Sequence, residues 1–153
     1  MLKNDTEEKQ KKEIPIPDST PEIVKPMISY IYTGNIPENI RHIAPELIQV
    51  SNKYQLEILV EACAEAIVEE LTDDNALKTL ALIDRHAPTS VNRNTVLDFI
   101  CENAKRVMKA ADWKEFKKLH PDLLSDILEL CADKYDESKA KIARMSTDSE
   151  ESE

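Results

Sequence analysis

The sequence predicts an all-α protein, and three observations lead to this prediction. Only one of the 153 residues is glycine, although turns between β-strands commonly use glycine. Apolar residues recur three and four positions apart along most of the chain between residues 24 and 131. Proline, threonine, asparagine and aspartate, which favour helix starts, precede these apolar runs. About six or seven helices are expected from this pattern.

The segment that organises the chain covers residues 24–71 and opens with a helix that ends at the only glycine. The apolar residues before this glycine fall at i, i+3, i+4 and i+7, so one stripe of the helix is expected to face the core: Val24, Met27, Ile28 and Ile31. Gly34 can adopt the left-handed conformation without a Cβ clash. It is therefore the predicted C-cap of this helix.

Prolines mark the start of this helix and of the next one. Thr20 precedes a proline, which is typical of an N-cap and the first helical position. Pro26 cannot donate a backbone hydrogen bond and predicts a bend. Residues 35–43 are expected to form a loop, and Pro45 to restart a helix that runs to about Tyr54.

Further helices follow. One is expected over residues 55–71, and Thr72 with the acids after it predicts the start of another. A longer helix is expected from about Val91 or Asn94 to Lys109, with Asn103 on its inner face. A short helix carrying Trp113 and a last helix complete the set. The predicted inner face of the last helix consists of Leu124, Ile127, Leu128 and Cys131.

Both ends of the chain are polar. Residues 1–19 interleave lysine and glutamate and are predicted to form at most a short edge strand, because two prolines remove backbone donors. Residues 133–153 lose the apolar pattern and end in serine, threonine and acids. We expect them to form a disordered acidic tail.

Charge and cysteine usage narrow the function classes. The net charge of −10 and the pI near 4.8 argue against a nucleic-acid partner, which would require clustered lysine and arginine. No apolar stretch approaches the ~20 residues that cross a bilayer. The three cysteines are widely spaced and lie on apolar helical faces. Reduced thiols in the nucleus or cytoplasm are therefore expected.

The cysteines and histidines do not form a recognisable catalytic or metal site. No Cys-x-x-Cys or closely spaced histidine pair is present, whereas structural zinc sites usually contain such pairs. Cys63 lies between Glu61 and Glu65, which disfavour a thiolate. We therefore predict no cofactor, no metal and no enzymatic activity.

Two tyrosines stand out. Tyr30 and Tyr32 lie about 160° apart around a helix axis, so at most one of them can face the core. The outward one is either an ordinary surface residue or an anchor for a protein partner, since tyrosine offers a large and stiff contact area.

Three stretches occur in order: MISYIYTGNI, LIQVSNKYQLEILVEACAEAIVEEL and DNALKTLALIDRHA. Together they resemble the second half of a BTB/POZ domain that continues into the helices called the 3-box and BACK region. The resemblance covers residues 13–131 and is greatest to the speckle-type POZ protein group. It implies a C-terminal BTB half over residues 20–71 and BACK-like helices over residues 72–132.

The resemblance also implies a function. Proteins of this group are adaptors that bind a cullin-3 scaffold and belong to ubiquitin-ligase biology. Carried over position by position, it places these residues nearest the scaffold: Glu8, Tyr30, Tyr32, Tyr54 and Asn75. The hydrophobic-x-Glu contact of the family falls on residues 6–8, where Thr6 occupies the apolar position.

This sequence departs from the family pattern in two further ways. The first half of the BTB domain, through which such domains dimerise, and the substrate-binding MATH domain are both missing from it. An alternative function is therefore an interaction module, or a fragment that pairs with itself or with full-length BTB relatives, without a role in ubiquitination.

Overall fold

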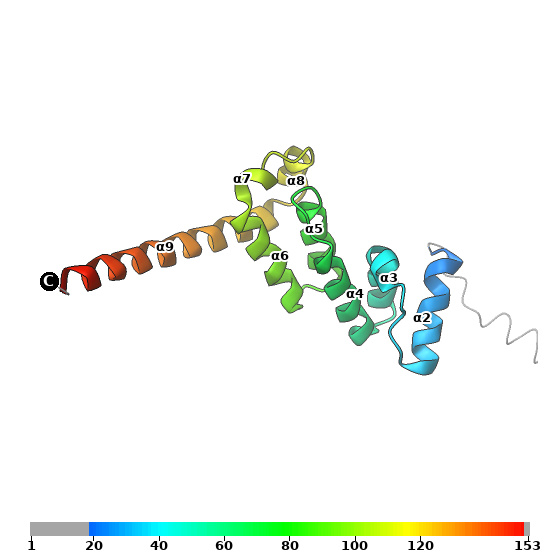
Figure 1. Ribbon diagram of the computed structural model, residues 1–153. Helices are drawn as coiled ribbons and strands as arrows, with labels where there is room; N and C mark the ends of the chain where they lie inside the picture. Colours follow the sequence, from blue (N-terminus) through cyan, green and yellow to red (C-terminus); the bar gives the residue numbers. More distant parts are fainter. Residues whose placement is uncertain (1–18, 152–153) are drawn as a thin grey trace, which may run out of the picture.

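The computed structural model describes the backbone of residues 19–151 and the side chains of residues 19–148. All regular structure in this part of the chain is helical, which confirms the predicted all-α class (Figure 1). Its helices are α2 (Pro21–Thr33), α3 (Ile40–Lys53), α4 (Glu57–Glu69), α5 (Ala76–His86), α6 (Val91–Glu102), α7 (Ala104–Val107), α8 (Trp113–Leu119) and α9 (Pro121–Glu151).

The core lies where α3, α4, α5 and α6 meet. The most extensive helix–helix contact is that between α3 and α4, and α5 packs mainly on α6. α2 covers one end of this group, and α9 leaves it at the other end (Figure 1). The largest side chains with almost no exposed surface are Leu47, Ile48, Leu59, Leu77, Leu80, Ile83, Val96, Ile100 and Val107.

The predicted glycine cap is confirmed at the end of α2. Gly34 has φ 71° and ψ 3°, in the left-handed region, and its N–H donates to the carbonyl of Tyr30 at 2.7 Å. A Cβ at this position would meet no atom within 4 Å. Backbone conformation, rather than space, is therefore the reason for glycine here.

The turn between α3 and α4 has the same left-handed geometry without a glycine. Gln55 has φ 58°, its N–H donates to Asn52 O at 3.1 Å, and the N–H of Leu56 donates to Ser51 O at 2.9 Å. These two bonds form a Schellman motif, which closes the C-terminus of α3. Because the motif reverses the chain within three residues, α4 must pack directly against α3.

The structure corrects the expected start of α3. We predicted a loop over residues 35–43 and a helix start at Pro45, but α3 begins at Ile40 and contains Pro45. Proline removes one hydrogen bond from the helix interior. Burial of Ala44, Leu47 and Ile48 on the same helix offsets that loss. α2 similarly continues through Pro26.

The inner face of α2 also differs from the prediction. Ile23 and Met27 are buried and Tyr30 is half-buried, whereas Ile28 and Ile31 are exposed. α2 carries two neighbouring apolar stripes, and helical spacing alone fits either of them. Only one stripe can face α3, so the other is left uncovered.

The expected long helix to Lys109 is interrupted. α6 ends at Glu102, and α7 begins at Ala104 after a turn at Asn103. The side-chain amide of Asn103 donates to the carbonyl of Phe99 at 2.8 Å, to which its own backbone N–H also donates. Asparagine side chains compete in this way with the continuing helical ladder.

The predicted disordered tail is helical through residue 151. α9 has 31 residues, and it contains neither glycine nor a proline after its first position. Straight-chain residues and alanine, which favour helices, occupy much of residues 133–145. The inner face of α9 is also shifted: Leu123 and Ile127 are buried, while Leu128 is exposed.

Arg93 fixes the base of α9 to the bundle. Its guanidinium on α6 binds Asp84 of α5 at 2.7 Å and Asp126 of α9 at 2.5 Å. Burial opposes the charge, but the two carboxylates outweigh it and raise the pKa of Arg93. One side chain thus joins three helices through charge-assisted hydrogen bonds.

Gly34 and Gln55 both have a left-handed backbone conformation. Removing the glycine at the first position and introducing one at the second should therefore have opposite effects on the free energy of unfolding. Gly34→Ala should destabilise the protein by about 1 kcal/mol through backbone strain. Gln55→Gly should stabilise it by about 0.5–1 kcal/mol, because relief of strain exceeds the added entropy of the unfolded chain. Urea unfolding measures both changes.

Gln49 provides the matched control for Gln55. Gln49 is exposed in the interior of α3, so Gln49→Gly should destabilise the protein by about 1 kcal/mol. A loss of stability in Gln55→Gly equal to that in Gln49→Gly would contradict the left-handed turn.

Candidate protein-binding surface

The outward side of α2 is the main candidate for binding a protein. Ile28, Ile31 and Tyr32 are 39%, 54% and 85% exposed, and we call these three residues the α2 surface. Ile36, in the loop that follows, is 40% exposed. Successive residues point about 100° apart around a helix, so the α2 surface lies beside and opposite the buried Ile23 and Met27. It combines two branched apolar side chains with one tyrosine.

The two tyrosines of α2 separate as expected. Tyr30 is half-buried and packs against the core. Its carbonyl accepts the hydrogen bond that the N–H of Gly34 donates at the end of α2. Tyr32 points outward and is almost fully exposed. Of these two predicted scaffold residues, only Tyr32 offers its ring to a partner.

Tyr54 has a structural position. It is the C-cap residue of α3, its N–H donates to Val50 O at 3.1 Å, and its half-buried ring packs against the core. Much of its ring surface is thus already covered by this chain.

Asn75 is held within its own turn. Its side-chain oxygen accepts from the N–H of Thr72 at 2.7 Å, and its backbone N–H donates to Thr72 Oγ1 at 3.3 Å. Its amide also donates to the carbonyl of Glu70 at 2.9 Å. Asn75 therefore fixes the entry into α5, while Thr72, the predicted start, lies three residues before it.

The predicted scaffold residues do not form one patch. Asn75 and Arg41 line the same hollow near the start of α3, whereas Tyr54 ends that helix. Arg41 precedes Tyr54 by 13 residues, or about 20 Å along a helix. Glu8 lies outside the described residues. Tyr32 is the predicted residue that the geometry leaves most available for contact.

The described residues provide little chemistry for catalysis. No group of three or more histidine, cysteine or acidic side chains among them could hold a metal ion. Burial raises the pKa of Cys63 to about 12. Burial, followed by the neighbouring Cys131, also raises the pKa of Cys101 to about 12. Neither thiol is poised as a nucleophile at neutral pH.

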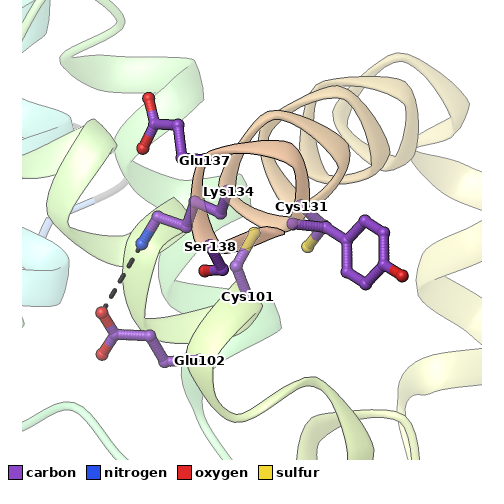
Figure 2. Close-up of a pocket in the computed structure, with 7 residues that line it drawn as sticks. Cys101, Glu102, Cys131, Lys134, Glu137 and Ser138 are labelled. Atoms are coloured by element: carbon purple, nitrogen blue, oxygen red, sulfur yellow. Dashed lines mark ion pairs between the residues drawn. The ribbon is translucent and has the colours of Figure 1, made fainter. Parts of the chain in front are cut away.

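Cys101 and Cys131 line a hollow between α6 and α9 (Figure 2). Its volume is about 520 Å³, and Glu102, Lys134, Tyr135, Glu137 and Ser138 complete the lining. Lys134 forms an ion pair with Glu102 across it at 3.5 Å.

Among the described helices, none is both long and apolar enough to span a membrane.

The nature of this helical fold is indicated by a comparison of the sequence with protein families. A BTB/POZ domain is detected in residues 1–71. The match therefore includes α2, α3 and α4 together with residues that precede the described part of the structure. A BTB/POZ domain indicates a module that binds proteins rather than an enzyme.

A particular relative extends the similarity beyond that domain. The chain is similar to "TD and POZ domain-containing protein 4" of Mus musculus, with 32% identity over 127 residues. The aligned part is 82% of this chain and 34% of the relative. The chain thus spans about a third of the length of this relative. These comparisons do not distinguish groups among BTB/POZ proteins, so the resemblance to the speckle-type POZ protein group stays a prediction.

The raised pKa of Cys63 predicts slow alkylation. At pH 8 the native protein should react with iodoacetamide at Cys63 at least about a hundredfold more slowly than in urea, because the thiolate is suppressed and access is blocked. Peptide mass spectrometry measures the rate.

The same shift has a stability consequence. An unfolded thiol ionises near 9.0, and the folded Cys63 does so near 12. The stability that the neutral buried thiol provides should therefore be lost as the pH rises from 9.0 towards 12. For the alkylation experiment, equal rates at Cys63 in the native protein and in urea would contradict its buried position.

Proposed function

We propose that this chain is a non-enzymatic adaptor that binds the N-terminal domain of a cullin-3 scaffold through the α2 surface, in the nucleus or cytoplasm, and thereby serves protein ubiquitination. The observation that carries the proposal is the exposure of Tyr32 beside Ile28 and Ile31. Apolar side chains around an exposed aromatic ring are characteristic of an interface centre.

Two further features support this proposal. The BTB/POZ domain match covers the helix that presents the surface. α2 also lies at the end of the bundle away from α9 (Figure 1), and the three residues of the α2 surface are exposed there. Tyr54 and Asn75 are assigned a supporting role in this proposal, because they fix the turns on which α3 and α5 depend.

The alternative is pairing with itself or with a BTB relative. The second apolar stripe of α2 favours it, since Val24 is half-buried and Ile28 and Ile31 are exposed beside the core face. Sedimentation of the purified chain distinguishes the two. A monomer that binds cullin-3 supports the adaptor function, whereas a dimer that is disrupted by Ile31→Ser supports pairing.

Replacement of Tyr32 tests the adaptor function. Tyr32→Ala should weaken binding of the cullin-3 N-terminal domain about thirtyfold, which corresponds to about 2 kcal/mol at an interface centre. Tyr135→Ala is the matched control, because Tyr135 is also exposed, at 67%, but lies on α9. Calorimetry measures both affinities. Equal binding by the two variants would place the contact elsewhere.

The N-terminal contact gives a second test that rests on sequence. Thr6→Met adds apolar area where the family has an apolar residue, and should tighten cullin-3 binding about fivefold after the cost of ordering the side chain. Glu8→Ala should weaken binding in both the native and the Thr6→Met chains. Equal affinity across all these chains would show that residues 6–8 do not reach the scaffold.

A further inference from the structure

Beyond the hollow beside α6, the distal part of α9 packs little against the other helices that the structure describes. Each described side chain from residue 135 to residue 148 is exposed, and the helix points away from the bundle (Figure 1). α9 packs only against α6 and α8 to any extent, near its beginning. A helix without packing partners gains little stability in water, because most helical stability in proteins comes from an apolar face that is covered.

An apolar seam runs along this helix at the spacing of a coiled coil. Its members alternate four and three residues apart, which is the a and d pattern of heptads. In chain order they are Leu124, Leu128, Cys131, Tyr135, Ser138, Ile142 and Met145. A repeat of 3.5 residues keeps such a seam on one side of a supercoiled helix.

The first part of the seam is partly covered, although Leu128 is 61% exposed, and the rest is open. Leu124 and Cys131 are half-buried, but Tyr135, Ile142 and Met145 are 67%, 68% and 69% exposed. The small Ser138, at a d position, lines the hollow of Figure 2 together with Tyr135. The seam thus passes a depression of about 520 Å³ at Cys131, Tyr135 and Ser138, which a large side chain of a second helix could enter.

The charges beside the seam are basic, although the chain is strongly acidic. From residue 132 to residue 141 the charged residues at the flanking e and g positions are Lys134, Lys139 and Lys141, and the acidic Asp148 occupies the g position after Met145. Lys134 forms ion pairs with Asp98 at 2.8 Å and with Glu102 at 3.5 Å. Lys139 and Lys141 are exposed. Asp133 lies away from the seam, whereas Glu102 and Glu137 line the hollow beside Tyr135 and Ser138. Residues at e and g select the partner of a coiled coil through their charge.

A second copy of this chain fits the seam poorly. In a parallel pair, Lys134 of one copy would face Lys139 of the other, and in an antiparallel pair Lys134 would face Lys141. Like charges at these positions are destabilising. Complementary charge requires glutamate or aspartate on the second helix.

We propose that residues 128–145 of α9 bind an amphipathic helix of another protein that carries apolar a and d residues flanked by acids. The two helices pack as a short coiled coil, with Tyr135, Ile142 and Met145 as the buried side chains and the lysines as the selective ones. This site is independent of the cullin-3 proposal, because the α2 surface lies at the other end of the bundle.

Designed peptides test the proposal with the full chain. One peptide has leucine at a and d and glutamate at e and g, and the other has lysine in place of glutamate. The acidic peptide should bind at least about tenfold more tightly than the basic one in fluorescence anisotropy. The double variant Lys139→Glu with Lys141→Glu should reverse this preference, and this reversal is specific to the proposed seam.

Matched variants locate the contact. Ile142→Ser should weaken binding of the acidic peptide about tenfold. Ala140→Ser, on the opposite side of α9, should leave it unchanged, and circular dichroism checks that both variants keep their helix. Tyr32→Ala should have no effect, so failure here is distinct from failure of the cullin-3 proposal. Equal binding of both peptides, or self-association that Ile142→Ser abolishes, would overturn the proposal.

Discussion

The packing of α3 against α4 is the contact on which the other helices depend. The Schellman turn at Gln55 reverses the chain within three residues, and the buried faces of the two helices then meet over most of their length. α2 covers one side of α3, while α5 and α6 complete the core beside α4. Loss of this hairpin would remove the surface that holds α2 and would expose the apolar residues of four helices.

The sequence predicted the fold class and the end of α2, and it failed where two signals conflict. Gly34 was predictable because only glycine adopts its conformation without strain. The start of α3 was not, since Pro45 is a strong local signal that burial of Leu47 and Ile48 overrides. The inner stripe of α2 was ambiguous, because both stripes are apolar and only contact with α3 selects Ile23 over Ile28.

The candidate site was predicted in part. The sequence predicted that at most one of Tyr30 and Tyr32 faces the core, without deciding which one. The structural roles of Tyr54 and Asn75 depend on contacts that spacing does not reveal. The hydrogen bonds of Asn75 to Thr72 and Glu70 are an example, since the sequence predicted that Thr72 caps the helix, whereas Asn75 is the N-cap residue of α5. In α9 the abundance of charge concealed a seam whose positions, three and four residues apart, are apolar except for Ser138.

The two exposed surfaces can act together because they rest on different contacts. α2 packs on α3, whereas the base of α9 is fixed to α5 and α6 by Arg93 and its two aspartates. Binding at one surface therefore requires no rearrangement at the other, and one chain could join two partners.

A net charge of −10 would repel an acidic partner helix at long range. At physiological salt this repulsion is screened beyond about 8 Å, and the distal part of α9 points away from the bundle (Figure 1). A docked helix is then affected mainly by the charged side chains closest to it. Beside the seam these side chains include Lys139 and Lys141. The acidity of the whole chain thus opposes non-specific association, while the local lysines favour a partner of the opposite sign.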